Sequence, residues 1–213
     1  MCGRFTLAPP EPTLRELIGP ADWTVPYTER WNVAPGQDVL TVTDGPDGRR
    51  VEPVRWGFPA SERAPAINAR SETAATSMLF RRAFAEARCI VPADAFYEWN
   101  GRGGQPWRVA LRDGRPFGFA AIRSEDGGLA ILTRAVTPGL AWLHDRMPAV
   151  LATRGAWRAW LNGDDPASLT GLFLGDDDAL VAHPVSRRVN SVLNDDPECA
   201  AEAPAEPRQM SLF

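Results

Sequence analysis

The second residue of the chain, Cys2, directly follows the initiator methionine. Removal of that methionine, which is usual before a small residue, would leave Cys2 with an α-amine and a thiol on adjacent carbons. Their ordinary pKa values of about 7.7–8.0 and about 8.5 leave both groups partly nucleophilic near neutral pH. A 1,2-aminothiol condenses with an aldehyde to an imine, and the thiol then closes the imine to a thiazolidine ring. Cys2 is therefore predicted to attack a carbonyl carbon, although a cysteine at this position can also be incidental.

All 23 of the Lys and Arg residues are arginine, and the chain contains no lysine. No side chain can therefore supply a primary amine in place of the chain terminus. The formal net charge is −4, yet residues 49–115 hold 12 arginines against 7 acidic residues. A basic segment in an acidic protein predicts an anionic ligand held at one place rather than general affinity for polyanions.

Two short polar segments contain residues that could assist such a nucleophile. Gly3 would let a ligand approach the backbone closely, and Arg4 could donate two hydrogen bonds to a phosphate. Farther along, Asn68 could orient an amine or a sugar hydroxyl, and Arg70 could hold a second phosphate. The segment around Asn68 could instead be a capped loop that precedes a helix.

Glu98 and His144 are the candidates for acid–base chemistry. Glu98 lies in an aromatic run expected to form a strand, where removal from water would raise its pKa toward values suited to a general acid. Outside such an environment it would be an ordinary residue of an edge strand. His144 follows a short predicted helix and stands beside Arg146, a position that suits either a proton shuttle or a structural histidine.

The elements that must position these residues are short and separated by many Gly and Pro residues. Apolar runs predict strands at 39–43, 51–58, 89–91, 95–99, 107–111, 117–122 and 129–134. Asx-Gly pairs between the later runs predict tight turns, so that residues 95–134 would form an antiparallel meander. Helices are predicted at 74–88, at 153–163, and after the Thr-Pro and Asp-Pro pairs at 137–138 and 165–166. We therefore expect an α+β fold with a mostly antiparallel, curved or barrel-like sheet core and short helices around it.

Composition excludes several other classes of protein. The three cysteines, Cys2, Cys89 and Cys199, show no paired or metal-type spacing, so neither a disulfide framework nor a metal site is expected. No cofactor is expected either. The longest uncharged stretches, 135–144 and 166–175, are ten residues long and too short to span a bilayer. A monomer in the bacterial cytoplasm, associated with the nucleoid, is the expectation.

Several segments carry a family resemblance in a consistent order along the chain. They are Met-Cys-Gly-Arg-Phe (1–5), Trp-Asn-Val-Ala-Pro (31–35), Arg-Trp-Gly (55–57), Asn-Ala-Arg-Ser-Glu (68–72), Cys-Ile-Val-Pro-Ala-Asp (89–94), Phe-Tyr-Glu-Trp (96–99) and His-Asp-Arg-Met-Pro (144–148), with a closing segment at 185–195. These segments resemble the SRAP (SOS-response-associated peptidase) family, whose members process abasic sites in DNA. The resemblance spans 1–198, implies the SRAP fold, and leaves 199–213 as a tail predicted to be disordered. Family members usually continue from Arg-Trp-Gly to a second tryptophan, which this chain lacks, so base stacking there would differ.

The resemblance implies a role for each matching residue. Cys2 would form a covalent adduct with an abasic site in single-stranded DNA and shield the lesion, with AP-lyase activity and removal of its own first methionine as accompanying activities. Asn68 would position the amine and the deoxyribose, Glu98 would act as acid and base, and His144 would assist proton transfer at the sugar hydroxyl. The implied DNA contacts are Gly3, Arg4, Pro35, Trp56, Arg70, Trp99, Thr133 and Arg146.

Two other functions fit parts of the same pattern. Class II glutamine amidotransferases also begin Met-Cys-Gly, so Cys2 could serve an N-terminal-cysteine amidohydrolase with the α-amine as base. A non-catalytic module that binds single-stranded DNA is the other alternative. Separately, the last five residues resemble the peptide by which bacterial proteins dock on the replicative sliding clamp; Gln209 begins it, and Leu212 and Phe213 would enter an apolar pocket of the clamp.

Overall fold

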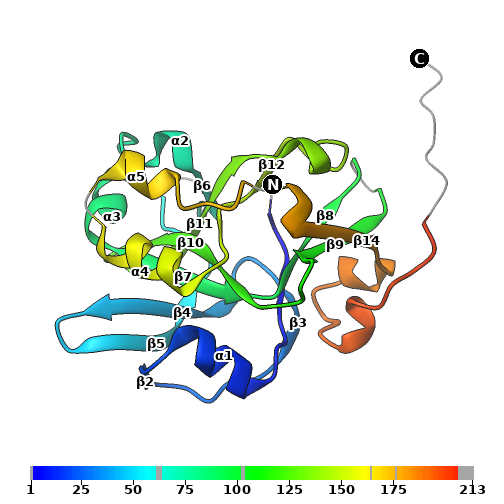
Figure 1. Cartoon of the computed structure of the whole chain (residues 1–213), viewed down its shortest axis with the longest axis horizontal. Coiled ribbons are helices and arrows are strands. Elements are labelled where there is room, and N and C mark those ends of the chain that lie inside the picture. The colour runs from blue at the N-terminus through cyan, green and yellow to red at the C-terminus, as the bar shows by residue number, and fades with distance from the viewer. Residues whose placement is uncertain (1, 61–63, 102–103, 164, 176, 206–213) are drawn as a thin grey trace.

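Two β-sheets face one another, and short helices lie outside them (Figure 1). The structure, a computed structural model, describes residues 2–60, 64–101, 104–163, 165–175 and 177–205. The first sheet has the strand order β14 (Leu180–Pro184), β9 (Pro106–Leu111), β8 (Ala95–Trp99), β1 (Phe5–Leu7) and β3 (Arg30–Val33). The second has the order β12 (Arg146–Pro148), β11 (Leu129–Ala135), β10 (Phe117–Arg123), β7 (Arg88–Ala93), β4 (Asp38–Gly45), β5 (Gly48–Arg55) and β2 (Asp22–Trp23).

Two further short strands join the second sheet: β13 (Val150–Leu151) pairs with β10, and β6 (Asn68–Arg70) runs parallel to β11. The β2–β5 pair is also parallel, and the remaining strand pairs of the described residues are antiparallel. The expected α+β class with a mostly antiparallel, curved sheet core is thus confirmed. The sheets are two separate layers and do not close into a barrel.

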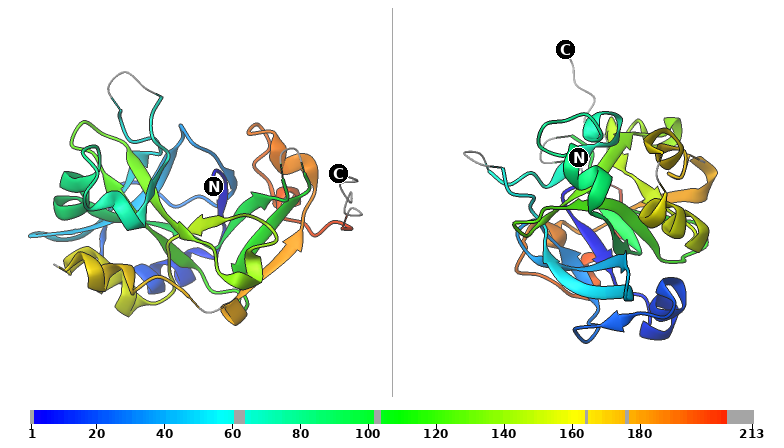
Figure 2. Two further views of the ribbon diagram at one scale, coloured as in Figure 1. Left: turned by 90° about the horizontal axis from the view of Figure 1, so that it is seen from above. Right: turned by 90° about the vertical axis from the view of Figure 1, so that its left-hand side faces the viewer.

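Aromatic side chains fill the space between the two sheets. Phe5 of the first sheet meets Phe119 of the second edge to face, with 5.5 Å between ring centroids. Phe96 lies 6.4 Å from the same ring, and Trp56 lies 5.4 Å from Phe5. Each of these side chains is at most 2% exposed, so each contributes roughly 1.5–3 kcal/mol through burial. These contacts hold β1, a strand of the first sheet, against the second sheet; Figure 2 shows this strand in dark blue near the middle of the molecule.

The helices are α1 (Glu11–Ile18), α2 (Ser71–Ala74), α3 (Arg81–Glu86), α4 (Arg154–Asn162) and α5 (Pro166–Thr170), with 3-10 turns η1 (Pro138–Leu140), η2 (Asp177–Ala179), η3 (Arg187–Asn190) and η4 (Pro197–Cys199). The expected helix at 153–163 is confirmed, because Thr153 Oγ1 accepts a hydrogen bond from the amide of Ala156 and Gly163 ends the helix. Trp157 of α4 packs on Gly118, on the side of the second sheet that faces away from the first. The Thr-Pro and Asp-Pro pairs open η1 and α5 as expected.

The continuous helix expected at 74–88 is wrong. Residues 75–80 form turns between α2 and α3, where the Thr76 hydroxyl donates to the carbonyl of Thr73. Hydroxyl side chains that bond to the nearby backbone compete with helix formation, which explains the break. Phe80 then packs edge to face on Phe58 at 5.3 Å, and Arg88 already begins β7.

The single meander expected over 95–134 is also wrong, although both of its outer hairpins are present. β8 pairs with β9, and β10 pairs with β11, but β9 and β10 belong to different sheets. The turn at Gly114 (φ 70°) carries the chain from one sheet to the other. Each strand has a better partner elsewhere: β9 pairs with β14 from the end of the chain, and β10 pairs with β7.

The first part of the expected tail is ordered, which corrects the prediction of disorder from residue 199 onward. Cys199 is fully buried, Glu202 forms a β-bridge with Val185, and the amide of Ala203 donates to the carbonyl of Pro184. Pro204 accepts a hydrogen bond from Gln105. Local composition could not reveal these pairings with β14. Gln209, Leu212 and Phe213 lie outside the described residues, so docking to a clamp stays a prediction.

Candidate active site

Cys2 lies three residues before β1, which is hydrogen-bonded to β8 on one side and to β3 on the other. Its side chain is 0% exposed. Burial raises the pKa of the Cys2 thiol to about 12, and the negative charge of Glu98 adds to this shift. The thiol is therefore neutral at physiological pH in this environment. Of the two nucleophiles that a processed Cys2 would carry, the amine is thus the one available to react first.

Asn68 holds Cys2 from the second sheet. It stands in β6, opposite Ile131 of β11, and its Nδ2 donates a 2.8 Å hydrogen bond to the carbonyl oxygen of Cys2. The other amide atom, Oδ1, is buried and accepts no hydrogen bond from the described residues. A buried acceptor without a donor costs about 1–3 kcal/mol, so it points to a donor supplied by a ligand or by a processed form of the protein.

Glu98 and His144, the residues predicted for acid–base chemistry, lie side by side. The Glu98 side chain is 7% exposed, and its Oε1 lies 3.9 Å from His144 Nε2. Burial raises the pKa of Glu98, against a smaller opposing effect of His144. His144 Nδ1 lies 2.9 Å from the amide nitrogen of Arg146, which donates to it, and 2.7 Å from an oxygen of Asp145. The other ring nitrogen, Nε2, faces Glu98.

Arg146 is fixed by an ion pair beside this group. Its guanidinium donates to both carboxylate oxygens of Glu72, at 2.6 and 2.9 Å, and to the carbonyl of Thr133 at 2.6 Å. The Arg146 guanidinium lowers the pKa of Glu72 to about 2. Thr133 itself is 1% exposed and supports Arg146 from below the surface, so its contact with DNA stays a prediction.

Arg70 differs from Arg146 in being exposed. It follows Asn68 by two positions on β6, so both side chains lie on one face of that strand. Within the described part of the chain, no carboxylate or carbonyl oxygen accepts a hydrogen bond from Arg70. Arg70 therefore has donors available for an anion next to the residue that holds Cys2.

Arg4 fastens the closing segment of the chain to the site. Its Nη1 donates to Asn32 Oδ1 at 2.8 Å and to the carbonyl of Val189 at 2.6 Å, and burial lowers the pKa of Arg4. The guanidinium carbon lies 6.0 Å from the Trp99 ring, whose Nε1 donates to Asn190. Arg4 and Trp99 thus brace residues 189–190, and a phosphate contact by Arg4 would use the remaining donors of its guanidinium.

Asn32 was given no role by the sequence, yet it is central to this bracing. Its side chain is 0% exposed, and its Nδ2 donates to the carbonyls of Val189, Ser191 and Asn194. Its place within the matched segment 31–35 could have pointed to Asn32. Position in a motif, however, does not distinguish a structural role from a chemical one.

Trp56, another of the residues predicted to contact DNA, lies in the core. It is 0% exposed, and its Nε1 donates to the carbonyl of Ile67 at 2.8 Å within the core. Base stacking on this ring would require the core to open. Gly3 and Pro35 are half-buried, and Pro35 lies in a turn with Gly36 (φ 82°).

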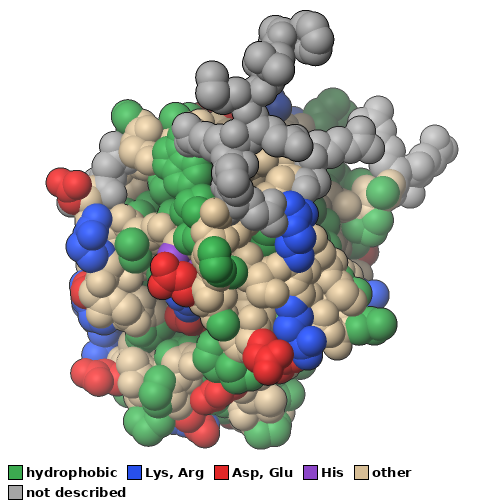
Figure 3. All heavy atoms as spheres, turned by 90° about the vertical axis from the view of Figure 1, so that its right-hand side faces the viewer, with side chains coloured by type: hydrophobic (Ala, Val, Ile, Leu, Met, Phe, Trp, Pro, Cys, Tyr) green, Lys and Arg blue, Asp and Glu red, His purple; other side chains and the backbone are tan. Residues whose placement is uncertain are grey.

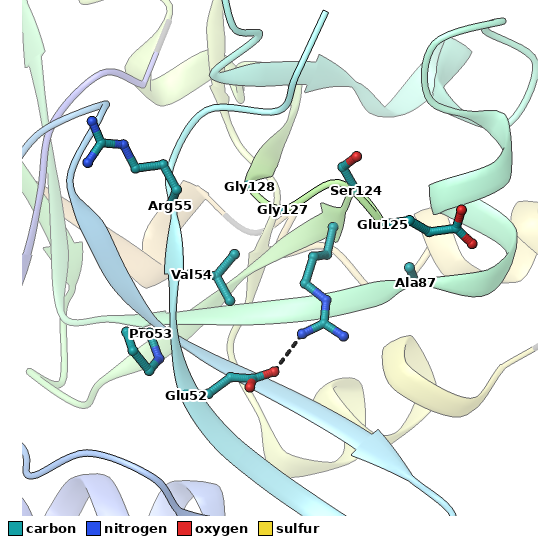
Figure 4. A pocket seen from close by; sticks show the side chains of 10 residues that line it. Glu52, Pro53, Val54, Arg55, Ala87, Ser124, Glu125, Gly127 and Gly128 are labelled. Atoms are coloured by element: carbon teal, nitrogen blue, oxygen red, sulfur yellow. Dashed lines mark hydrogen bonds and ion pairs between the residues drawn. The ribbon is translucent and has the colours of Figure 1, made fainter.

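The larger of two pockets lies away from the candidate site, and a small one adjoins it. A small pocket lined by Phe96, Glu98, Leu140, His144, Arg146 and Met147 lies at the site. A larger one, of about 510 Å³, lies away from it, between β5 and the turn that joins β10 to β11 (Figure 4). There Arg123 is paired with Glu52 at 2.5 Å, so this pocket has no free charge from that arginine for an anion.

The surface around β14 carries no segregated patch of one charge in the described residues (Figure 3). Basic, acidic and apolar side chains are interspersed over the described part of the face that carries β14 (Figure 3). Among the described residues, no group of three or more His, Cys, Asp or Glu side chains is placed to hold a metal ion. The same residues contain no helix with the length and apolar character needed to cross a membrane.

Comparison with known proteins places this arrangement in a family. The family model "SOS response associated peptidase (SRAP)" matches residues 1–192. The abasic site processing protein YedK of Escherichia coli (strain K12) is 35% identical over 214 residues, covering 91% of this chain and 96% of the relative. The abasic site processing protein HMCES of Xenopus tropicalis is 27% identical over 261 residues, covering 94% and 78%.

Solved structures agree in fold. A phage-related protein of Bordetella bronchiseptica superposes with a TM-score of 0.72 at 24% identity, covering 86% of this chain and 94% of that one. A protein of Bacteroides thetaiotaomicron gives a TM-score of 0.78 at 21% identity, covering 95% and 100%. With the family model matched over most of its length and relatives above 30% identity, the chain belongs to the SRAP family.

Proposed function

We propose that this protein captures abasic sites in single-stranded DNA as a thiazolidine on Cys2, and so shields the lesion. The observation that carries the proposal is the meeting of Cys2, Asn68, Glu98 and His144, which come from both sheets and from the loop before β12, at the buried chain terminus. Relatives named abasic site processing proteins support the same substrate. They also favour it over the amidohydrolase alternative.

The chemistry begins with the sugar. An abasic deoxyribose is mostly a closed hemiacetal, and Glu98, whose pKa is raised by burial, would in its protonated form donate a proton to the ring oxygen as the ring opens. The free α-amine of Cys2 would then add to the C1′ aldehyde, and loss of one water would give the imine. Asn68 Oδ1, the acceptor without a donor, would hold the amine in line for this attack.

The neutral thiol of Cys2 would close the thiazolidine ring in the next step. The Cys2 sulfur would add to the imine carbon, and its proton would pass to the imine nitrogen, so that the product is the protein plus the DNA less one water. An imine that is not closed can lose the 3′ phosphate by β-elimination, which is the lyase activity. Placing the thiol beside the forming imine favours closure over strand cleavage.

Intact mass spectrometry tests the proposal directly. Incubation of the protein with an abasic single-stranded oligonucleotide should give a species with the mass of the methionine-free protein plus the oligonucleotide less one water. An oligonucleotide without the lesion should give none. A protein that retains Met1 and still captures the lesion would contradict the scheme. DNA binding without any covalent species would instead support the non-catalytic module.

Arg70 is expected to contribute a phosphate contact. The Arg70→Ala variant should bind a single-stranded abasic oligonucleotide several-fold more weakly at low salt, because an exposed guanidinium beside Asn68 is lost. Its plot of log affinity against log salt concentration should be shallower by about 0.7, the value for one phosphate contact to a single strand. Fluorescence anisotropy at several salt concentrations measures both.

The matched control is Arg158→Ala, an exposed arginine on α4, which packs on the outer side of the second sheet. It removes the same charge and should leave the salt slope unchanged. Equal slopes for both variants would show that Arg70 acts only through the overall charge.

A further inference from the structure

An aromatic pair borders the Glu98–His144 group. Trp107 of β9 lies directly opposite Glu98 of β8, and opposite residues of an antiparallel pair project from the same face with their Cβ atoms about 4.5–5.5 Å apart. Trp142 precedes His144 by two residues in the loop between β11 and β12. The Trp107 and Trp142 rings meet nearly at right angles, at 80°, with 4.7 Å between centroids. The pair therefore adjoins the acid–base group from two directions.

Trp142 is exposed but held in place. It is 36% exposed, whereas the other described tryptophans are buried or half-buried. Its loop is a compact turn, in which Leu143 donates from its amide to the carbonyl of Leu140, and both leucine side chains are buried. A large ring kept at the surface by a fixed turn and a neighbouring ring is typical of a contact surface for a ligand.

We infer that Trp142, backed by Trp107, stacks on the nucleobase next to the abasic position, an inference that rests on the proposed function. The lesion itself has no base, so an aromatic ring at this site can stack only on a flanking nucleotide. Single-stranded DNA is bound by cationic groups that contact phosphates and by aromatic rings that stack on bases. Here Arg70 of β6, which is exposed, supplies the first, and Trp107 of β9 and Trp142 of the β11–β12 loop supply the second.

The test uses an oligonucleotide in which the lesion is tetrahydrofuran, an abasic analogue that lacks the C1′ hydroxyl and cannot open to an aldehyde. Binding is then non-covalent and independent of Cys2 chemistry. Trp142→Ala should weaken affinity about 10-fold, the order expected for one stacked base, and Trp142→Phe should retain most of it. Trp23→Ala is the matched control, because Trp23 is a half-buried ring stacked on Arg15 at 4.2 Å in the distant β2.

A second oligonucleotide, which lacks the flanking bases as well, completes a double-mutant cycle. The wild type should bind it about 10-fold more weakly, and Trp142→Ala should then cost nothing further. A 2-aminopurine at one flanking position should be quenched by the wild type and by Trp23→Ala but not by Trp142→Ala. An equal loss by Trp142→Ala on both oligonucleotides, or unchanged quenching, overturns the inference. Absence of a covalent product from the wild type on a true abasic strand would refute the proposed function alone.

Discussion

Replacing Cys2 with alanine is expected to abolish covalent capture of an abasic oligonucleotide completely. The variant keeps the α-amine but loses the thiol that closes the ring, so any imine remains reversible and hydrolyses during denaturing electrophoresis. Because the chain has no lysine, no other side chain offers a primary amine that could replace this one. Denaturing gels and intact mass after incubation with the oligonucleotide measure the loss. A full-strength band from the variant would reject the scheme.

Cys89 provides the matched control for this experiment. Its thiol is as buried as that of Cys2, and burial raises its pKa to about 12 as well, but it lies within β7, far along the chain from the terminal amine. Cys89→Ala should therefore capture at the wild-type level, apart from any loss of stability. Treatment of Cys2→Ala with borohydride should trap the imine as a stable amine, which separates loss of ring closure from loss of DNA binding.

Replacing Asn32 with alanine is expected to have the largest effect on stability. The Asn32 side chain accepts from Arg4 and donates to the carbonyls of Val189, Ser191 and Asn194 in a fully buried position. Each such hydrogen bond contributes about 0.5–1.5 kcal/mol, and more with a charged partner. We expect a loss of about 3 kcal/mol in the free energy of unfolding, which lowers Tm by roughly 6–12 °C for a chain of this size.

Asn190→Ala is the comparison for Asn32→Ala. Asn190 is exposed, and its side chain accepts one hydrogen bond, from Trp99, so its loss should cost about 1 kcal/mol or less. Thermal unfolding followed by circular dichroism distinguishes the two variants. Equal Tm values would mean that the closing segment is held by apolar packing rather than by Asn32.

The candidate residues of the site were easier to predict from the sequence than the residues around them. Cys2, Asn68, Glu98 and His144 were recognisable because each matches a segment that is continuous in sequence, and the structure brings them together. The burial of Trp56 and Thr133, which were predicted to contact DNA, could not be foreseen, because whether a ring or a hydroxyl reaches the surface depends on which strands cover it. Trp56 is covered by Phe5 from the first sheet, a contact across 51 positions of sequence.

The seven apolar runs predicted as strands are strands, but β1, β3 and β6 were not predicted, and only some of the strand pairings were. Alternation and Asx-Gly turns are local signals, and the hairpins β8–β9 and β10–β11 follow from them. Assignment of β9 and β10 to different sheets depends on β14 and β7, which pair with them from distant parts of the chain. The same distant pairing with β14 orders residues 199–205, whose composition alone is typical of a tail.

The position of β1 has a mechanical consequence. Phe5 is three residues from Cys2 and is paired with Val33 on one side and Phe96 on the other, so a DNA strand joined to Cys2 would be anchored in the interior of a five-stranded sheet. Tension along that strand, from a polymerase or helicase that pulls on it, would load the backbone hydrogen bonds on both edges of β1 together, in shear. Under such tension, β1 would detach only when the first sheet unfolds, at a rate set by the unfolding barrier.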